Sequence, residues 1–253
     1  MDSLSGLDAP FRGRVTYEFQ AEVGKRLRNH LSPAQREAFD LYARELLEAR
    51  RRTNLTSLRD RDTIERRLFL ESVALLNALT DAAAIESPVI DIGTGAGIPG
   101  LPLKIMRPDL EVALLEATGK KVRFLEEVVR QLDLKDVQVL QGRAEELAHD
   151  PAHREAYALA LARAVAPLRI LLELALPFVR QGGYLAAAKG SGAAREVREA
   201  EKALAECGGA IDRLVSLDVP GPGPVPTLVL VRKTAPTPQR YPRRTGLPRK
   251  RPL

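Results

Sequence analysis

The chain has 253 residues, a formal net charge of +6 and 45% hydrophobic residues, which is enough apolar surface for a sizeable core. A single cysteine excludes an internal disulfide framework, and no apolar run is long enough to cross a bilayer. The three histidines lack metal-ligand spacing and the N-terminus lacks the apolar stretch of a signal peptide, so we expect a cytoplasmic protein without a metal ion.

Residues 1–84 are predicted to form an N-terminal helical region. The segment from Ser32 to Gln35 is a capping box with proline in the first helical position, and apolar residues follow at helical spacing as far as Ala49. A basic segment then leads into a second apolar helix, which is predicted over residues 63–79.

Strand and helix patterns alternate after residue 85. The first five predicted strands are 88–93, 111–117, 137–142, 158–164 and 183–190. This alternation implies a parallel sheet with helices on both faces. Two further strands, predicted over 215–220 and 226–233, have no helix between them and can form an antiparallel pair at the sheet edge. Residues 85–233 are therefore predicted to be one α/β domain.

Gly95, Gly97 and Gly100 form a G-x-G-x-x-G sequence between the first strand and the helix that follows it. Ligands of parallel α/β sheets bind at the carboxyl ends of the strands, and glycines let the backbone approach a ligand closely. NAD and S-adenosylmethionine both use this geometry. Glu116, at the end of the second strand, can hold the ribose hydroxyls of either cofactor, so neither feature decides between the two.

Asp91 stands at the end of the first strand, just before the glycines. A carboxylate there repels the pyrophosphate of a dinucleotide but attracts the ammonium and sulfonium groups of S-adenosylmethionine. Pro99 also removes one amide that could bind an anion. Both residues favour S-adenosylmethionine. The alternative is that Asp91 only caps the following helix.

Two later strand ends complete the predicted site. Ala144 and Glu145 follow the third strand, where an amide and an acid can read adenine; the alternative is an ordinary acidic first helical turn. Arg163 ends the fourth strand and is predicted to lie in the site; the alternative is a simple pair with a neighbouring carboxylate. This strand lacks the Asn/Asp-Pro-Pro-aromatic sequence of many exocyclic-amine methyltransferases. Cys207 lies in a predicted helix end, which disfavours cytosine C-5 chemistry.

The excess positive charge lies in residues 232–253, which contain eight Lys or Arg and no acid, so the rest of the chain is slightly acidic. The prolines and the lack of apolar periodicity argue against a helix or a central strand there. Residues 234–253 are therefore predicted to be a basic tail with two interpretations. It is either a disordered solubilising segment or an arm that binds the phosphates of a polyanion.

Six motifs together resemble a known family: TNLTSLRD, DIGTGAGIPGLPL, GKKVRFL, LARAVAPL, AAKG and YPRRTGLPRKRPL. From about Asn54 onward the chain resembles the bacterial 16S rRNA guanine-N-7 methyltransferase family RsmG, also called GidB. The resemblance implies a class I S-adenosylmethionine-dependent methyltransferase fold, with a Rossmann-like, doubly wound, mostly parallel sheet. It also implies methylation of the N-7 atom of guanine 527 in the 530 loop of 16S rRNA. The small ribosomal subunit would then be the partner of an enzyme that we expect to be a monomer.

The family motifs imply a donor site lined by Gly93, Ile98, Glu116, Ala117, Thr118, Ala144, Glu145 and Arg163, and the residues discussed above add Asp91 and Gly95. Arg163 would orient the reactants without a general base, because guanine N-7 has a free lone pair and loses no proton. RNA-binding residues are predicted in the tail: Arg240, Arg243, Arg244, Arg249, Lys250 and Arg251. Family members often carry Arg-His before the Leu-Glu-Ser segment. Here Arg67 is followed by Leu68, so no role of that histidine carries over.

Two other functions remain compatible with the sequence. One is an NAD-dependent oxidoreductase, which the glycine spacing permits, and titration with both cofactors would separate it from a methyltransferase. The other is a non-catalytic RNA-binding ribosome assembly factor that retains the fold. Labelled donor and isolated small subunits would test that alternative.

Overall fold

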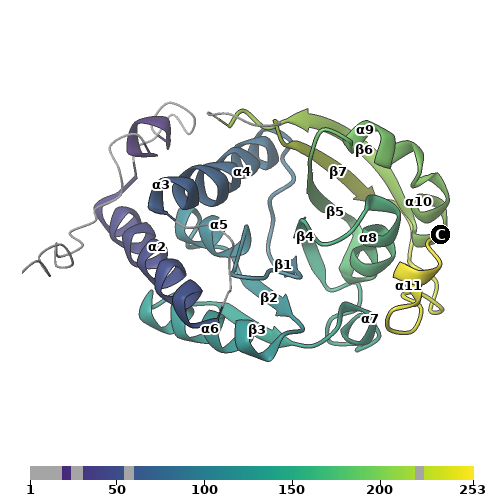
Figure 1. Cartoon of the computed structure of the whole chain (residues 1–253). Coiled ribbons are helices and arrows are strands. Elements are labelled where there is room, and N and C mark those ends of the chain that lie inside the picture. The colour runs from purple at the N-terminus through teal and green to yellow at the C-terminus, as the bar shows by residue number, and fades with distance from the viewer. Residues whose placement is uncertain (1–18, 24–30, 54–59, 220–224) are drawn as a thin grey trace, which may run out of the picture.

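The computed structural model of the chain describes residues 19–23, 31–53, 60–219 and 225–253, with the side chains of residues 50–53 excepted. Its centre is a seven-stranded sheet in the order β3-β2-β1-β4-β5-β7-β6 (Figure 1). The strands are β1 Val89–Ile92, β2 Val112–Glu116, β3 Val137–Gln141, β4 Tyr157–Arg163, β5 Val179–Lys189, β6 Gly209–Ser216 and β7 Thr227–Lys233. Strands β1 to β5 are parallel, and β7 runs antiparallel to both β5 and β6. The predicted doubly wound, mostly parallel sheet is confirmed.

Helices cover both faces of the sheet. One face carries α2 Pro33–Thr53, α3 Arg61–Ile64, the π-helix η1 Glu65–Leu70, α4 Glu71–Asp81, α5 Gly100–Met106 and α6 Gly119–Gln131. The other carries α7 Ala144–Leu147, α8 Leu168–Ala175, the 3₁₀ turn η2 Leu176–Phe178, α9 Ala193–Arg198 and α10 Glu201–Cys207. Consecutive residues of β1 divide between the two faces, with Val89 in one cluster and Ile90 in the other, as the period of two in a strand requires.

The N-terminal helices pack directly on the sheet. Their buried residues, such as Phe39 and Phe69, belong to the same hydrophobic cluster as Val112 of β2. The predicted capping box is confirmed: the Gln35 amide donates to Ser32 Oγ at 3.1 Å, and the Ser32 amide donates to Gln35 Oε1 at 2.9 Å. The division into residues 1–84, 85–233 and 234–253 stays a prediction.

The predicted second helix is interrupted. The segment that was expected as one helix over 63–79 consists of α3, the π-helix η1 and α4 in direct succession. A π-helix is wider than an α-helix, and its i→i+5 pairing leaves no mark in a short apolar pattern. Asp60 caps the first turn by accepting a hydrogen bond from the Thr63 amide at 2.8 Å.

The antiparallel pair at the sheet edge is confirmed, but one of its two strands lies earlier in the chain than predicted. β7 matches the predicted strand over 226–233, whereas β6 occupies 209–216 and shares only its last two residues with the predicted 215–220. The reason is that β6 begins directly after α10, at Gly208, which has φ +73° and turns the chain straight back into the sheet. Several β6 side chains are exposed, so apolar content marks this edge strand poorly.

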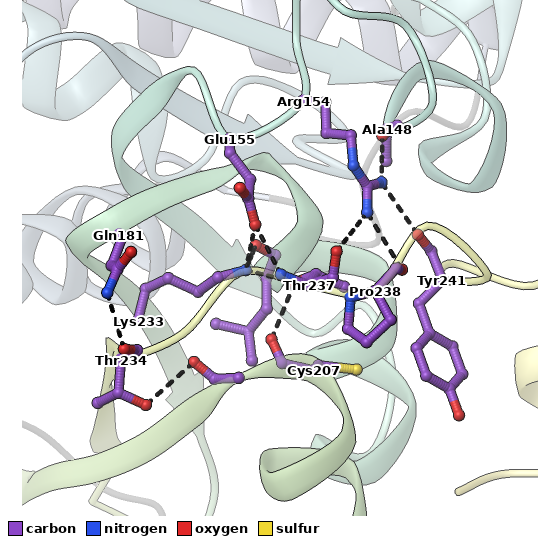
Figure 2. Close-up of polar contacts among 12 residues, drawn as sticks. Ala148, Arg154, Glu155, Gln181, Cys207, Lys233, Thr234, Thr237, Pro238 and Tyr241 are labelled. Atoms are coloured by element: carbon purple, nitrogen blue, oxygen red, sulfur yellow. Dashed lines mark hydrogen bonds and ion pairs between the residues drawn. The ribbon is translucent and has the colours of Figure 1, made fainter.

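The basic tail packs against α7, α8 and α10, which excludes the interpretation of a disordered segment. Figure 2 shows the Arg154 guanidinium donating to carbonyls of Ala148, Thr237, Pro238 and Tyr241 over 2.7–3.2 Å. The tail also contains a short helix that the sequence did not predict, α11 Leu247–Lys250, whose first turn holds a proline.

Buried ions complete the attachment of the tail. Lys233, the last residue of β7, is fully buried; its Nζ pairs with Glu155 at 3.1 Å and donates to the Thr237 hydroxyl of the tail, and the Thr237 amide donates to the same Glu155 carboxylate at 2.7 Å. Glu173 on α8 is also fully buried, and it accepts three hydrogen bonds from the backbone amide, Nε and Nη2 of Arg243. Lys233 and Glu173 therefore both have oppositely charged partners, as the burial of a charge requires.

Candidate active site

The loop after β1 has a backbone that requires glycine. Gly93 and Gly95 both have φ +64°, and Gly97 has φ +95°. A Cβ on Gly97 would lie 2.4 Å from Leu101 Cδ1 and 2.9 Å from the Tyr42 hydroxyl. The loop turns tightly at the carboxyl end of β1, where the strand order reverses between β1 and β4. This is the place at which parallel α/β sheets bind their ligands.

Asp91 lies behind this loop and is fully buried. Its Oδ2 accepts hydrogen bonds from Thr94 Oγ1 at 2.6 Å and from the Gly100 amide at 2.9 Å, so the carboxylate caps α5. Burial raises the pKa of Asp91 to about 6, although these two hydrogen bonds act in the opposite direction. The capping role is thus present in the structure. Asp91 Oδ1 is buried without a hydrogen-bond partner, and the donor-binding role stays a prediction.

Glu116 joins the glycine loop to the next strand end. Its Oε2 accepts from the Gly95 amide at 3.1 Å and its Oε1 from the Thr118 amide at 2.8 Å. Lys121 Nζ lies 3.7 Å from the same carboxylate. Each carboxylate oxygen has a further lone pair, so Glu116 can still accept hydrogen bonds from a ligand.

Ala144 and Glu145 open the short helix α7 at the carboxyl end of β3, as predicted, but Glu145 has a second role. Its Oε1 accepts a hydrogen bond from the Gly246 amide at 3.1 Å, and the neighbouring Glu146 accepts one from the Thr245 hydroxyl at 3.1 Å. The tail therefore crosses the predicted adenine side of the site. The separation of about a hundred residues left no local signal for this contact.

Arg163 forms an ion pair with Glu71, which agrees with the alternative interpretation that Arg163 pairs with a neighbouring carboxylate. Its Nε and Nη2 donate to the two carboxylate oxygens of Glu71 at 3.0 and 2.9 Å, and Nη2 also donates to the Arg67 carbonyl at 2.9 Å. The next residue, Ala164, has φ +54°, a left-handed conformation that is costly without glycine and often occurs at functional sites. Nothing in the sequence pointed to Glu71.

This pair lines a cleft of about 550 Å³ at the carboxyl ends of β4 and β5. The cleft is also lined by Arg67, Lys189, Glu196 and Arg249. Its volume suits a small ligand or a single extruded base. A second cavity of about 310 Å³ lies at the amino ends of the strands, between Pro88 and Gln138, which is the opposite edge from the glycine loop.

Sequence comparison gives this site a context. The model of the GidB family, described as rRNA small subunit methyltransferase G, matches residues 35–219. The chain belongs to this family. It is 43% identical over 242 residues to the ribosomal RNA small subunit methyltransferase G of Moorella thermoacetica, covering 96% of this chain and 98% of that protein. It is 46% identical over 223 residues to the protein of the same name from Roseiflexus castenholzii, covering 88% and 94%.

The GidB-family chain also has the fold that the resemblance implied. It superposes on a SAM dependent methyltransferase from Aquifex aeolicus with a TM-score of 0.51 and 21% identity, covering 71% of this chain and 96% of that one. The class I methyltransferase fold is therefore confirmed. In the described parts of this chain, no helix is both long and apolar enough to cross a membrane, and no three His, Cys, Asp or Glu side chains are grouped to hold a metal.

The tail of this GidB-family chain divides the predicted RNA-binding residues into two groups. Arg243 is paired with buried Glu173, and Arg240 pairs with Glu206 at 2.7 Å, so both have intramolecular partners. Arg249 donates to the Val165 carbonyl at 3.0 Å, on the rim of the cleft. Arg240, Arg244, Arg249, Lys250 and Arg251 are all exposed, so of the six predicted residues Arg243 is the one that is partly buried.

Proposed function

We propose that this protein transfers a methyl group from S-adenosylmethionine to the N-7 atom of a guanine in 16S rRNA. Guanine 527 of the 530 loop is the position expected from the family resemblance. The observation that carries the proposal is the adjacency of two features at one sheet edge. The glycine loop and Glu116 end β1 and β2, and the cleft with Arg163 opens at the ends of β4 and β5.

The residues at the first three strand ends suit S-adenosylmethionine. The buried Asp91 and the nearly buried Glu116 place two carboxyl groups around the glycine loop, which favours a cationic ligand over a pyrophosphate. Glu116 would accept the ribose hydroxyls, and the amide of Ala144 would read the adenine edge. S-adenosylmethionine supplies an activated methyl group, while these residues bind and orient it.

The acceptor side suits an atom that needs no deprotonation. Guanine N-7 has a free lone pair, so the new bond to the methyl carbon forms as the sulfur–carbon bond breaks and sulfur keeps that electron pair. The two carboxylates of the cleft are occupied, Glu71 by Arg163 and Glu196 by Lys189 at 2.9 Å. Catalysis would therefore consist mainly of alignment, with Arg163 as the orienting residue.

A covalent mechanism finds no support in the position of the cysteine. Cys207 is buried at the end of α10, and burial raises the pKa of its thiol to about 12, which disfavours a thiolate nucleophile. An NAD-dependent activity is disfavoured by the carboxyl groups around the loop. A non-catalytic assembly role would share the RNA surface but would not require the donor site.

Labelled methyl transfer tests the proposal. Purified protein and labelled S-adenosylmethionine are incubated with 16S rRNA or with isolated small subunits, and the labelled base is mapped by chemical cleavage at N-7-methylguanine. We expect label at one guanine, strong loss of rate in Arg163→Ala, and a normal rate in Arg180→Ala. Arg180 is a matched control because it pairs with exposed Glu86 at the opposite edge of the sheet. Absence of label in rRNA, or preferential binding of NAD by calorimetry, would overturn the proposal.

A further inference from the structure

The cleft contains two carboxylates among the residues that the structure describes, and they differ in what holds them. Glu196 forms an ion pair with Lys189 at 2.9 Å and accepts a hydrogen bond from the Leu168 amide at 2.7 Å, so it fixes the start of α8. Glu71 instead faces the guanidinium of Arg163 with both oxygens, and its side chain is only 12% exposed. Of the two, Glu71 presents a complete, two-oxygen acceptor to the cleft.

A guanidinium and the Watson–Crick edge of guanine present the same donor pattern. In both, two N–H groups on nitrogens joined through one carbon point in parallel, and a carboxylate accepts both bonds together. In guanine these donors are N1–H and the 2-amino group. Adenine and cytosine carry a ring acceptor at the matching position, and uracil has a single donor between two acceptors. Guanine is therefore the RNA base that can take the place of the Arg163 fork.

We propose that Glu71 selects guanine as the acceptor base, by accepting N1–H and the 2-amino group on the two oxygens that Arg163 occupies in this structure. The inference rests on the proposed function and deepens it. N-7 lies on the opposite side of the purine from the 2-amino group, so a base held in this way keeps N-7 free for the methyl group. Extruded bases are commonly read through this edge.

After the exchange, both charged side chains still have hydrogen-bond partners, although these partners are neutral. Arg163 retains the Arg67 carbonyl, which its Nη2 contacts at 2.9 Å, and the O-6 acceptor of guanine lies next to N1. Methyl transfer moves positive charge onto the purine, which strengthens both hydrogen bonds to the Glu71 carboxylate. Glu71 thus stabilises the transition state more than the bound substrate, the condition for a rate effect.

Inosine provides the test, because it keeps N-7, O-6 and N1–H but lacks the 2-amino group. Small subunits are assembled with guanosine or inosine at the acceptor position, and single-turnover methylation is measured for wild type and for Glu71→Gln. We expect wild type to prefer guanosine by about 10- to 100-fold, the effect of one hydrogen bond to a charged acceptor. In Glu71→Gln the preference should fall to about threefold or less, with unchanged donor affinity.

Control variants separate this role from a purely structural one. Glu196→Gln removes the charge of the other carboxylate and should keep the wild-type preference. Glu71→Asp keeps the charge and should fold like wild type. Because its carboxylate is withdrawn by one methylene group, it should show a preference for guanosine between those of wild type and Glu71→Gln. If Glu71→Gln does not fold, Glu71→Asp provides the test.

The outcomes distinguish the two proposals. If wild type does not methylate the guanosine substrate, the proposed function itself fails. If wild type is active but Glu71→Gln slows both substrates by the same factor, Glu71 only positions Arg163 and the specificity role is wrong. A wild type that methylates inosine and guanosine equally well would also overturn it.

Discussion

Removal of the Arg243 side chain tests the docking of the basic tail. Glu173 is fully buried on α8, and its three hydrogen bonds all come from Arg243, two of them from the guanidinium at 2.8 and 2.6 Å. Arg243→Ala would leave a buried carboxylate with one backbone donor. Breaking a buried ion pair in this way costs about 3–5 kcal/mol. We expect the free energy of unfolding to fall by about that amount, unless the tail detaches first and lets water reach Glu173.

Urea unfolding measures this cost, and Arg240→Ala is the matched control. The Arg240 side chain is 66% exposed and pairs with Glu206, so its loss should change the free energy of unfolding by about 0–1 kcal/mol. The double variant Arg243→Ala/Glu173→Gln should be more stable than Arg243→Ala alone, because it removes the unpaired charge. Equal, small effects of Arg243→Ala and Arg240→Ala would show that Glu173 is solvated and that the tail is not docked as described.

Three further predictions concern the donor loop and the tail. Burial raises the pKa of Asp91 from 3.8 to about 6, so folding favours the protonated carboxyl group. The folded protein should therefore lose about 3 kcal/mol of its free energy of unfolding as the pH rises from about 4 to 6 and Asp91 ionises. Asp91→Asn should remove that loss in thermal unfolding across this pH range, and an unchanged pH profile would contradict the assignment. Gly97→Ala places a Cβ 2.4 Å from Leu101 Cδ1 at a residue with φ +95°. It should lower the free energy of unfolding by about 1–3 kcal/mol and weaken the binding of S-adenosylmethionine, which calorimetry measures. If the variant has the stability and the donor affinity of wild type, position 97 does not require glycine. Replacing Lys250 and Arg251 by glutamine should reduce the slope of log affinity for rRNA against log salt by about 1.4 if both contact phosphates, with donor affinity unchanged. An unaltered slope would exclude both side chains from RNA binding.

The sequence predicted those parts of the fold whose causes are local. Strands β1, β2 and β4 are short, almost fully buried runs, and buried parallel strands require a largely apolar pattern. The Ser32 capping box depends on residues three apart, so its two hydrogen bonds could be predicted as well. β6 was misplaced because an exposed edge strand needs little apolar content.

The candidate site was predictable only in part, because its contacts join residues that are far apart in the sequence. Residues at the strand ends, such as Glu116 and Arg163, could be placed because parallel strands bring their carboxyl ends together. Their partners could not be placed. Glu71 meets Arg163 across 92 residues and Gly246 meets Glu145 across 101, and one sequence carries no record of which distant groups pair. The buried capping contact of Asp91 was foreseen only as an alternative.

The π-helix η1 constrains the length of the chain around the cleft. Upstream of it Ile64 is buried, and downstream of it the apolar face of α4 is buried, so both flanking helices are fixed in rotation by the core. The Arg67 carbonyl in this wide turn and the side chain of Glu71, the first residue of α4, contact the same guanidinium of Arg163. A π-helical turn holds about one residue more than an α-helical turn, so deleting one residue here would let η1 become an α-helix while both flanking helices keep their packed faces. The deletion would move the Arg67 carbonyl relative to Glu71, so we expect its cost to fall on the contacts with Arg163 and not on the core.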